Sequence, residues 1–169
     1  MASYAPGMGS HADMFLKLDG VEGESNDKSH KGEIEILSFS FGAVQPGSAG
    51  RGGGAGVGKV QIQDFNFAKY FDKASPKLFE ACATGKHLPK VTLTCRKAGG
   101  SQQEYLKITM SEALVASIQN SGSGGETLPT ESVSLNFTKI EIEYKPQDEK
   151  GGLGGVVKAG WDSAQNQKV

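Results

Sequence analysis

An alternating run, Glu33-Ile-Glu-Ile-Leu-Ser-Phe-Ser-Phe41, sets the fold class of this chain. Apolar and polar side chains exchange places along it, a period of two that is typical of a β-strand with one face on a core. The apolar parity changes between Ile36 and Phe39. A one-residue shift within a strand indicates a β-bulge, and bulges bend a sheet and help it to close.

The same alternation recurs along most of the chain. A second parity change follows Phe137, where another bulge is expected. Further strands are predicted at 60–63, 91–96, 105–110, 113–118, 133–137 and 140–144. Threonine and β-branched residues are frequent in these runs, as half-buried pleated surfaces prefer. The pattern therefore predicts a mainly β domain, whose bent strands would help it to close into a barrel.

One helix is predicted, beginning near Ser75 and ending at Gly85. Ser75 is expected to be its N-cap, Pro76 suits the first helical position, and Gly85 can supply the left-handed stop. Its apolar stripe is expected to consist of Leu78, Phe79 and Cys82. In a mainly β chain such a helix closes one end of the barrel or packs on its outside.

Composition limits the function classes. The chain has 169 residues, a net charge of −1 and a pI near 6.3, which suits one domain and gives no bulk attraction to nucleic acid. No run of 18 apolar residues and no signal peptide is found, so membrane insertion and the general export route are not expected. Residues 1–12 are interpreted as a leader, disordered or foreign to the domain, and 13–169 as the single domain.

Chemical motifs are scarce. Gly53-Gly-Ala-Gly-Val-Gly58-Lys59 fits the P-loop pattern, but Val60 follows where the pattern needs Ser or Thr, and a strand follows where it needs a helix. Cys82 and Cys95 are expected to be reduced and buried, although a single bridge is possible. We therefore expect no catalytic residues, no metal and no cofactor.

The remaining polar residues favour ordinary structural roles. His30 and His87 lie in predicted polar turns, without the spacing of a metal site. The acidic turn 19–27 is expected to be solvated, since it does not match a calcium-binding loop. The carboxylates of Glu131, Glu141 and Glu143 are expected on solvent-facing sides of strands.

Three segments resemble the Hcp family, the tube subunit of the bacterial type VI secretion machine. They are Asp13-Met-Phe-Leu-Lys-Leu-Asp-Gly-Val-Glu-Gly-Glu-Ser25, Gly85-Lys-His-Leu-Pro-Lys-Val-Thr-Leu-Thr-Cys-Arg-Lys-Ala-Gly-Gly100 and Gly160-Trp-Asp162. The resemblance covers roughly residues 13–166. It implies an antiparallel β-barrel with one helix and a long glycine-rich extended loop, similar to phage tail-tube proteins.

The resemblance also implies partners and a route. Hcp proteins form homohexameric rings that stack into a tube, a contractile sheath drives the tube out of the cell, and a spike protein caps it. Effector proteins ride in the lumen. The protein would be cytoplasmic before firing and extracellular afterwards, with no nucleic-acid partner. Few residues follow Tyr144, so a fused toxin domain is not expected.

Candidate site residues follow from alternation and from the resemblance together. The lumen wall is expected to include polar residues that lie opposite apolar strand positions: Ser38, Ser40, Gln61 and Gln63. The ring-stacking loop, expected to reach the adjacent ring, contains Gly47, Arg51, Gly53, Gly56 and Gly58. Trp161 is the single tryptophan, expected to anchor the C-terminal segment onto its own barrel or onto a neighbouring subunit.

An alternative is a monomeric β-barrel that binds a small ligand. It would need an interior cavity, whereas the apolar sets here are sufficient to fill a small barrel. The mass in solution separates this monomer from a ring.

Overall fold

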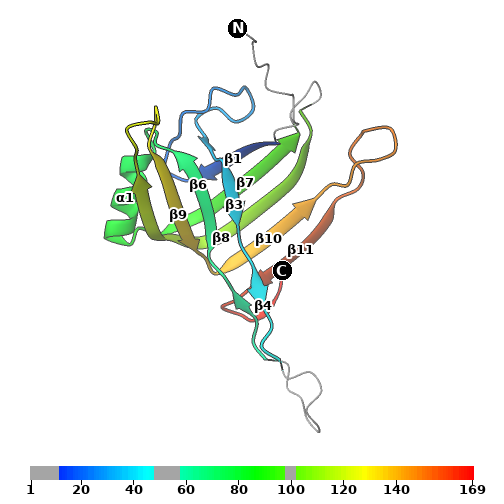
Figure 1. Ribbon diagram of the computed structural model, residues 1–169. Coiled ribbons are helices and arrows are strands. Elements are labelled where there is room, and N and C mark those ends of the chain that lie inside the picture. The colour runs from blue at the N-terminus through cyan, green and yellow to red at the C-terminus, as the bar shows by residue number, and fades with distance from the viewer. Residues whose placement is uncertain (1–11, 48–57, 98–101) are drawn as a thin grey trace.

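The computed structural model describes residues 12–47, 58–97 and 102–169 (Figure 1). The expected mainly β chain with one helix is confirmed. The elements are β1 (Ala12–Leu18), β2 (Ile34–Glu35), β3 (Ser38–Ser40), β4 (Ala43–Val44), β5 (Gln61–Ile62), β6 (Phe65–Tyr70), α1 (Ser75–Thr84), β7 (Leu88–Lys97), β8 (Glu104–Ser121), β9 (Thr130–Asn136), β10 (Lys139–Tyr144), β11 (Val157–Asp162) and β12 (Gln167–Lys168).

The strands form two antiparallel layers that share the long strand β8. One layer has the order β2-β1-β7-β8-β10-β11-β12, and the other has the order β3-β6-β9-β8. The first part of β8 pairs with β7 and β10, and its second part, from Leu114 onward, pairs with β9. Strands β4 and β5 form a separate hairpin that projects from the molecule (Figure 1).

The two predicted bulges are wrong, because the chain changes sheet at both places. The Ile36 N–H donates to the Met14 carbonyl of β1 at 3.1 Å, whereas the Leu37 N–H donates to the Ala68 carbonyl of β6 at 2.7 Å. After Phe137 the chain likewise leaves β9 in one layer for β10 in the other. Changing layers reverses which parity faces the core, and this produces the pattern that alternation alone attributes to a bulge.

Strand β8 differs from the prediction in length. The separate strand expected at 113–118 is the second part of one strand that runs from Glu104 to Ser121. Register irregularities do occur elsewhere, between Cys95 and Arg96 in β7 and between Val115 and Ser117 in β8. The irregularity in β8 lies close to the point where this strand passes from one layer to the other.

The core lies between the two layers and contains the alternating apolar residues of both. Its fully buried members include Leu16, Ile34, Phe65, Leu93 and Leu135. Phe39 and Phe41 pack against this cluster, and their rings lie 5.7 and 6.2 Å from the ring of Phe65. Burial of these side chains on both layers is the main favourable term that holds the sheets together.

Helix α1 packs on the sheet next to β8, and two details differ from the prediction. Ser75 is the first helical residue and not the N-cap, a position that Ala74 occupies without a side-chain hydrogen bond. Phe79 is 60% exposed, and Ala81 lies in the buried stripe beside Leu78. The predicted stop is confirmed, since Gly85 has a φ of 63° in the left-handed region.

Candidate functional surfaces

One outward face of the molecule carries two rows of uncharged, mostly polar side chains, with Asp64 at one end, where its carboxylate accepts from the Asn136 amide at 3.0 Å. It belongs to the layer β3-β6-β9-β8, on the side away from the core. Two rows cross this layer in register, Ser40-Asn66-Ser134-Ser117 and Ser38-Ala68-Ser132-Gln119. The Ser134 hydroxyl donates to the Asn66 side-chain carbonyl within this face. We call these eight residues the uncharged face.

The four lumen candidates are all exposed, but they lie on two different elements. Ser38 and Ser40 lie on β3 and form one edge of the uncharged face. Gln61 and Gln63 lie on or next to β5, which pairs with β4 and not with β6. The Gln63 N–H donates to the Gly42 carbonyl at 2.8 Å. The two glutamines therefore line the base of the projecting hairpin.

The glycine-rich candidates belong to the same hairpin. Gly47 and Gly58 are described, and Arg51, Gly53 and Gly56 lie outside the described residues. A Cβ on Gly58 would lie 3.3 Å from the Gln45 amide oxygen and from the Pro46 ring, tighter than most contacts. Glycine at 58 thus lets the two arms of the hairpin approach closely.

Trp161 lies in β11, opposite Ile140 of β10 and Lys168 of β12. It lines an apolar groove of about 500 Å³ between the β4–β5 hairpin and strands β10 and β11, together with Phe41, Val60, Ile62, Ile140 and Ile142. The Trp161 indole Nε1 is buried, with no hydrogen-bond partner among the described residues. The segment around Trp161 is a paired strand from Val157 to Asp162.

The outward face of the other layer is charged. Lys107 of β8, Glu143 of β10 and Lys158 of β11 form one row across it. The Lys158 ammonium donates to Glu143 at 2.5 Å, and this bond lowers the pKa of the Glu143 carboxyl and raises that of Lys158. Lys90 of β7, Lys139 of β10 and Lys145, directly after β10, extend the charged surface. The two outward faces of the molecule therefore differ in chemistry.

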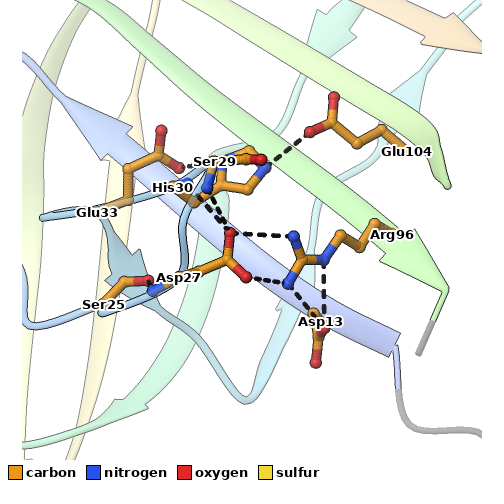
Figure 2. Close-up of polar contacts among 8 residues, drawn as sticks. All are labelled: Asp13, Ser25, Asp27, Ser29, His30, Glu33, Arg96 and Glu104. Atoms are coloured by element: carbon orange, nitrogen blue, oxygen red, sulfur yellow. Dashed lines mark hydrogen bonds and ion pairs between the residues drawn. The ribbon is translucent and has the colours of Figure 1, made fainter. Parts of the chain in front are cut away.

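The loop 19–33 folds back over the edge of this charged layer and is held by Arg96 (Figure 2). The Arg96 guanidinium donates to both carboxylate oxygens of Asp27 and, at 3.2 and 3.3 Å, to Asp13 of β1. Arg96 is only 4% exposed. Its hydrogen bonds lower the pKa of Asp27 from the ordinary 3.8 to about 2. Asp27 is thus an anchor, and the prediction of a fully solvated acidic turn is wrong at this residue.

His30 is also part of this anchor, which the sequence prediction of a polar turn missed. It is 6% exposed, and its ring stacks on the Phe15 ring with centroids 4.4 Å apart and planes 7° from parallel. Its Nδ1 lies 2.8 Å from Glu33 and its Nε2 lies 2.7 Å from Glu104. Arg96 also contacts Phe15, with its Cζ atom 4.9 Å from the ring centroid.

A second charged cluster is buried beneath the start of α1. Lys69 of β6 is 0% exposed and Glu131 of β9 is 2% exposed, so the prediction of a solvent-facing Glu131 is wrong. The Lys69 ammonium donates to Glu131 at 2.5 Å, to Ser75 at 2.9 Å and to Asp72 at 2.8 Å. The burial of Lys69 could have been predicted from alternation, because Lys69 has the same parity along β6 as the buried Phe65 and Phe67.

Within residues 12–47, 58–97 and 102–169 no group of three or more metal-ligating side chains is found. Cys82 and Cys95 are unpaired, and burial raises the pKa of the Cys95 thiol to about 11, which keeps it protonated. No helix in the described ranges is long and apolar enough to cross a bilayer.

Comparison with known proteins identifies the family. Residues 15–144 match the family model described as type VI secretion system effector, Hcp. The chain belongs to the Hcp family. Protein hcp1 of Pseudomonas aeruginosa strain PAO1 is 52% identical over 156 residues, which cover 91% of this chain and 96% of that protein. The resemblance drawn from the three sequence segments is thereby confirmed.

Solved structures agree with this assignment. A structure described as a type six secretion system protein has a TM-score of 0.89 at 33% identity and covers 94% of this chain and 100% of its own. Hcp1 from Salmonella typhimurium has a TM-score of 0.79 at 41% identity and covers 94% of this chain and 99% of its own. The chain is therefore an Hcp protein of the type VI secretion system, a structural and not an enzymatic family, and the small-ligand alternative is set aside.

Proposed function

We propose that this Hcp protein forms hexameric rings that stack into the secretion tube, with the uncharged face lining the lumen. The observation that carries the proposal is the contrast between the two outward faces. One carries two rows of serine, asparagine and glutamine with a single carboxylate, Asp64, at their end, and the other carries paired lysines and glutamates. A lumen that accepts varied effectors needs a wall with few fixed charges, because like charges would repel some cargo strongly.

The edges of the layer β3-β6-β9-β8 support ring closure. Among the described residues, β3 pairs only with β6, and β8 beyond Leu114 pairs only with β9. Unpaired strand edges expose backbone donors and acceptors that can pair with another chain. Joining the β8 edge of one copy to the β3 edge of the next would continue the uncharged face around a ring.

The ring is tested by measuring the solution mass with light scattering on a sizing column and imaging the same peak by negative stain. Six-fold rings with a central hole are expected. A monomer at all concentrations would contradict the proposal and would return the apolar groove to consideration as a ligand site.

The lumen assignment is tested by Ser40→Gln. The longer side chain is expected to crowd the uncharged face and weaken effector binding to the ring about tenfold, without changing the ring mass. Ala83→Gln, on the exposed side of α1, is the matched control and should bind normally. Equal binding by Ser40→Gln and wild type would show that β3 does not line the cargo site.

The hairpin is proposed to contact the adjacent ring. Ordering a glycine-rich loop costs conformational entropy, so stacking of free rings should be weak. Deletion of residues 48–56 is expected to leave hexamers intact and to shorten tubes seen by electron microscopy. Loss of the hexamer itself would contradict this role.

In the cell, we propose that a contractile sheath surrounds the tube, that a spike caps it, and that the protein passes from the cytoplasm to the exterior on firing.

A further inference from the structure

The ring of His30 is enclosed between two carboxylates. Its Nδ1 is 2.8 Å from Glu33 Oε2, on the same loop, and its Nε2 is 2.7 Å from Glu104 Oε1, at the start of β8. Figure 2 shows the two contacts on opposite sides of the ring. Both distances are those of charge-assisted hydrogen bonds.

A neutral imidazole cannot make both contacts. It has one N–H donor and one lone-pair acceptor, whereas an ionised carboxylate only accepts. One of the two short contacts would then bring a nitrogen lone pair against a carboxylate oxygen. A ring with a proton on each nitrogen donates to both carboxylates and satisfies both contacts.

The surrounding charges favour the protonated ring. Four carboxylates face this region, from Asp13 on β1, Asp27 and Glu33 on the loop, and Glu104 on β8. Arg96 on β7 pairs with two of them, and the loop also carries Lys28 and Lys31, both exposed. A charged His30 supplies a second buried cation to this excess of negative charge. The Glu104 side chain is half-exposed, so its end of the clamp lies at the surface.

We propose that His30 is doubly protonated in the folded protein and that this imidazolium clamps the 19–33 loop to β8. Loss of one ring proton at higher pH removes one contact, and the loop loosens. The clamp acts beside the Arg96–Asp27 anchor. The hydrogen bonds of that anchor still hold the loop on the sheet when the clamp contact is lost. The proposal concerns the fold of a single subunit and is independent of the lumen and stacking assignments.

The test is hydrogen exchange of the 19–33 segment in the full-length protein, followed by mass spectrometry. Wild type, His30→Gln and Glu104→Gln are compared at equal pH across about pH 6 to 9, so that the intrinsic exchange chemistry cancels. His87→Gln is the matched control, because His87 also contacts a carboxylate, Glu112, but its side chain is 57% exposed.

At pH 6 the loop of the wild type should exchange about tenfold more slowly than that of His30→Gln, and by a smaller factor more slowly than that of Glu104→Gln, whose amide oxygen still accepts a weaker, uncharged hydrogen bond. This ratio should shrink as the pH rises, and His87→Gln should follow the wild type throughout. A ratio that does not change with pH would overturn the proposal. So would slower loop exchange in Glu104→Gln, because its amide can donate to a neutral ring nitrogen but not to an imidazolium.

A second readout avoids variants that unfold. Histidine-selective ¹⁵N labelling of the wild type reports the protonation of each ring nitrogen directly. Two protonated-type nitrogen signals from His30 at neutral pH are expected. A lone-pair-type signal from either nitrogen at that pH would overturn the proposal, whatever the loop exchange shows.

Discussion

Two charged clusters fasten non-strand segments to the sheets, and they do so in different environments. The Lys69–Glu131 cluster holds the start of α1 in a site where both side chains are fully buried. The Arg96–Asp27 anchor holds the 19–33 loop on an outer face, where Asp13 is well exposed and Asp27 lies near the surface. Each fixes a segment that alternation alone does not place.

The two clusters differ in how much it costs to remove one charged partner. In the buried cluster, removal of one partner leaves a charge with no solvent to compensate it, so each member is costly to lose. At the anchor Arg96 is itself buried, but it has two carboxylate partners, one of them on the half-exposed Asp13, so loss of Asp27 leaves Arg96 paired and the cost is smaller and depends on salt and pH. The first cluster should therefore behave as part of the core, and the second as a surface device with adjustable strength.

The largest expected effect is that of Glu131→Ala. It leaves the Lys69 ammonium buried without its strongest acceptor, and we expect the free energy of unfolding to fall by about 3–5 kcal/mol. Denaturation by guanidinium chloride at a fixed protein concentration measures this loss. A loss no larger than that of a surface substitution would contradict the comparison.

The double variant Lys69→Met with Glu131→Leu is the control for this interpretation. Replacing both charges with apolar groups removes the unpaired ammonium, so most of the stability lost in Glu131→Ala should return. If the double variant is as unstable as the single one, the attraction between the two charges is itself the source of stability.

A smaller, pH-dependent effect is expected for Asp27→Asn. The Asp27 pKa is lowered from 3.8 to about 2, so the bond to Arg96 contributes stability above about pH 4 and loses it as the pH falls through 2. Denaturation midpoints of wild type and variant should differ by a constant amount at neutral pH and converge near pH 2. A difference that persists unchanged to pH 2 would show that the carboxylate charge is not responsible.

The smallest effect is expected for Lys158→Gln on the charged outer face. Its ion pair with Glu143 joins two adjacent strands that also share backbone hydrogen bonds, and the Lys158 side chain is well exposed. The denaturation midpoint should not change measurably. A loss comparable to that of Asp27→Asn would show that exposure does not separate the two classes of ion pair.

Much of the fold could be predicted because its signals are local. Alternation places Phe39 and Phe41 toward the core and Ser38 and Ser40 away from it, and Gly85 ends the helix where expected. The prediction failed at positions where the local structure depends on residues far away in the sequence. Whether a parity change is a bulge or a change of layer depends on which strand is the partner, and the partner of Leu37 is Ala68.

The candidate residues show the same limit. Ser38, Ser40, Gln61 and Gln63 can be selected from alternation, but the residues that complete the uncharged face come from β6, β9 and β8. The buried Lys69–Glu131 pair could have been suspected from parity, since both residues occupy core positions on strands that turned out to be neighbours. The roles of Arg96 and His30 depend on a loop whose path has no periodic signal.

The sequence by itself determined the family, the strand content, the helix stop and the absence of recognisable catalytic motifs, because each depends on residues close together in the chain. The tertiary structure decided which strands pair, which charges are buried and which outward face is uncharged. These properties are set by register between segments many residues apart, such as Lys69 opposite Glu131 and His30 beside Glu104. Burial then fixes the strength of each contact, and burial exists only once the layers have packed.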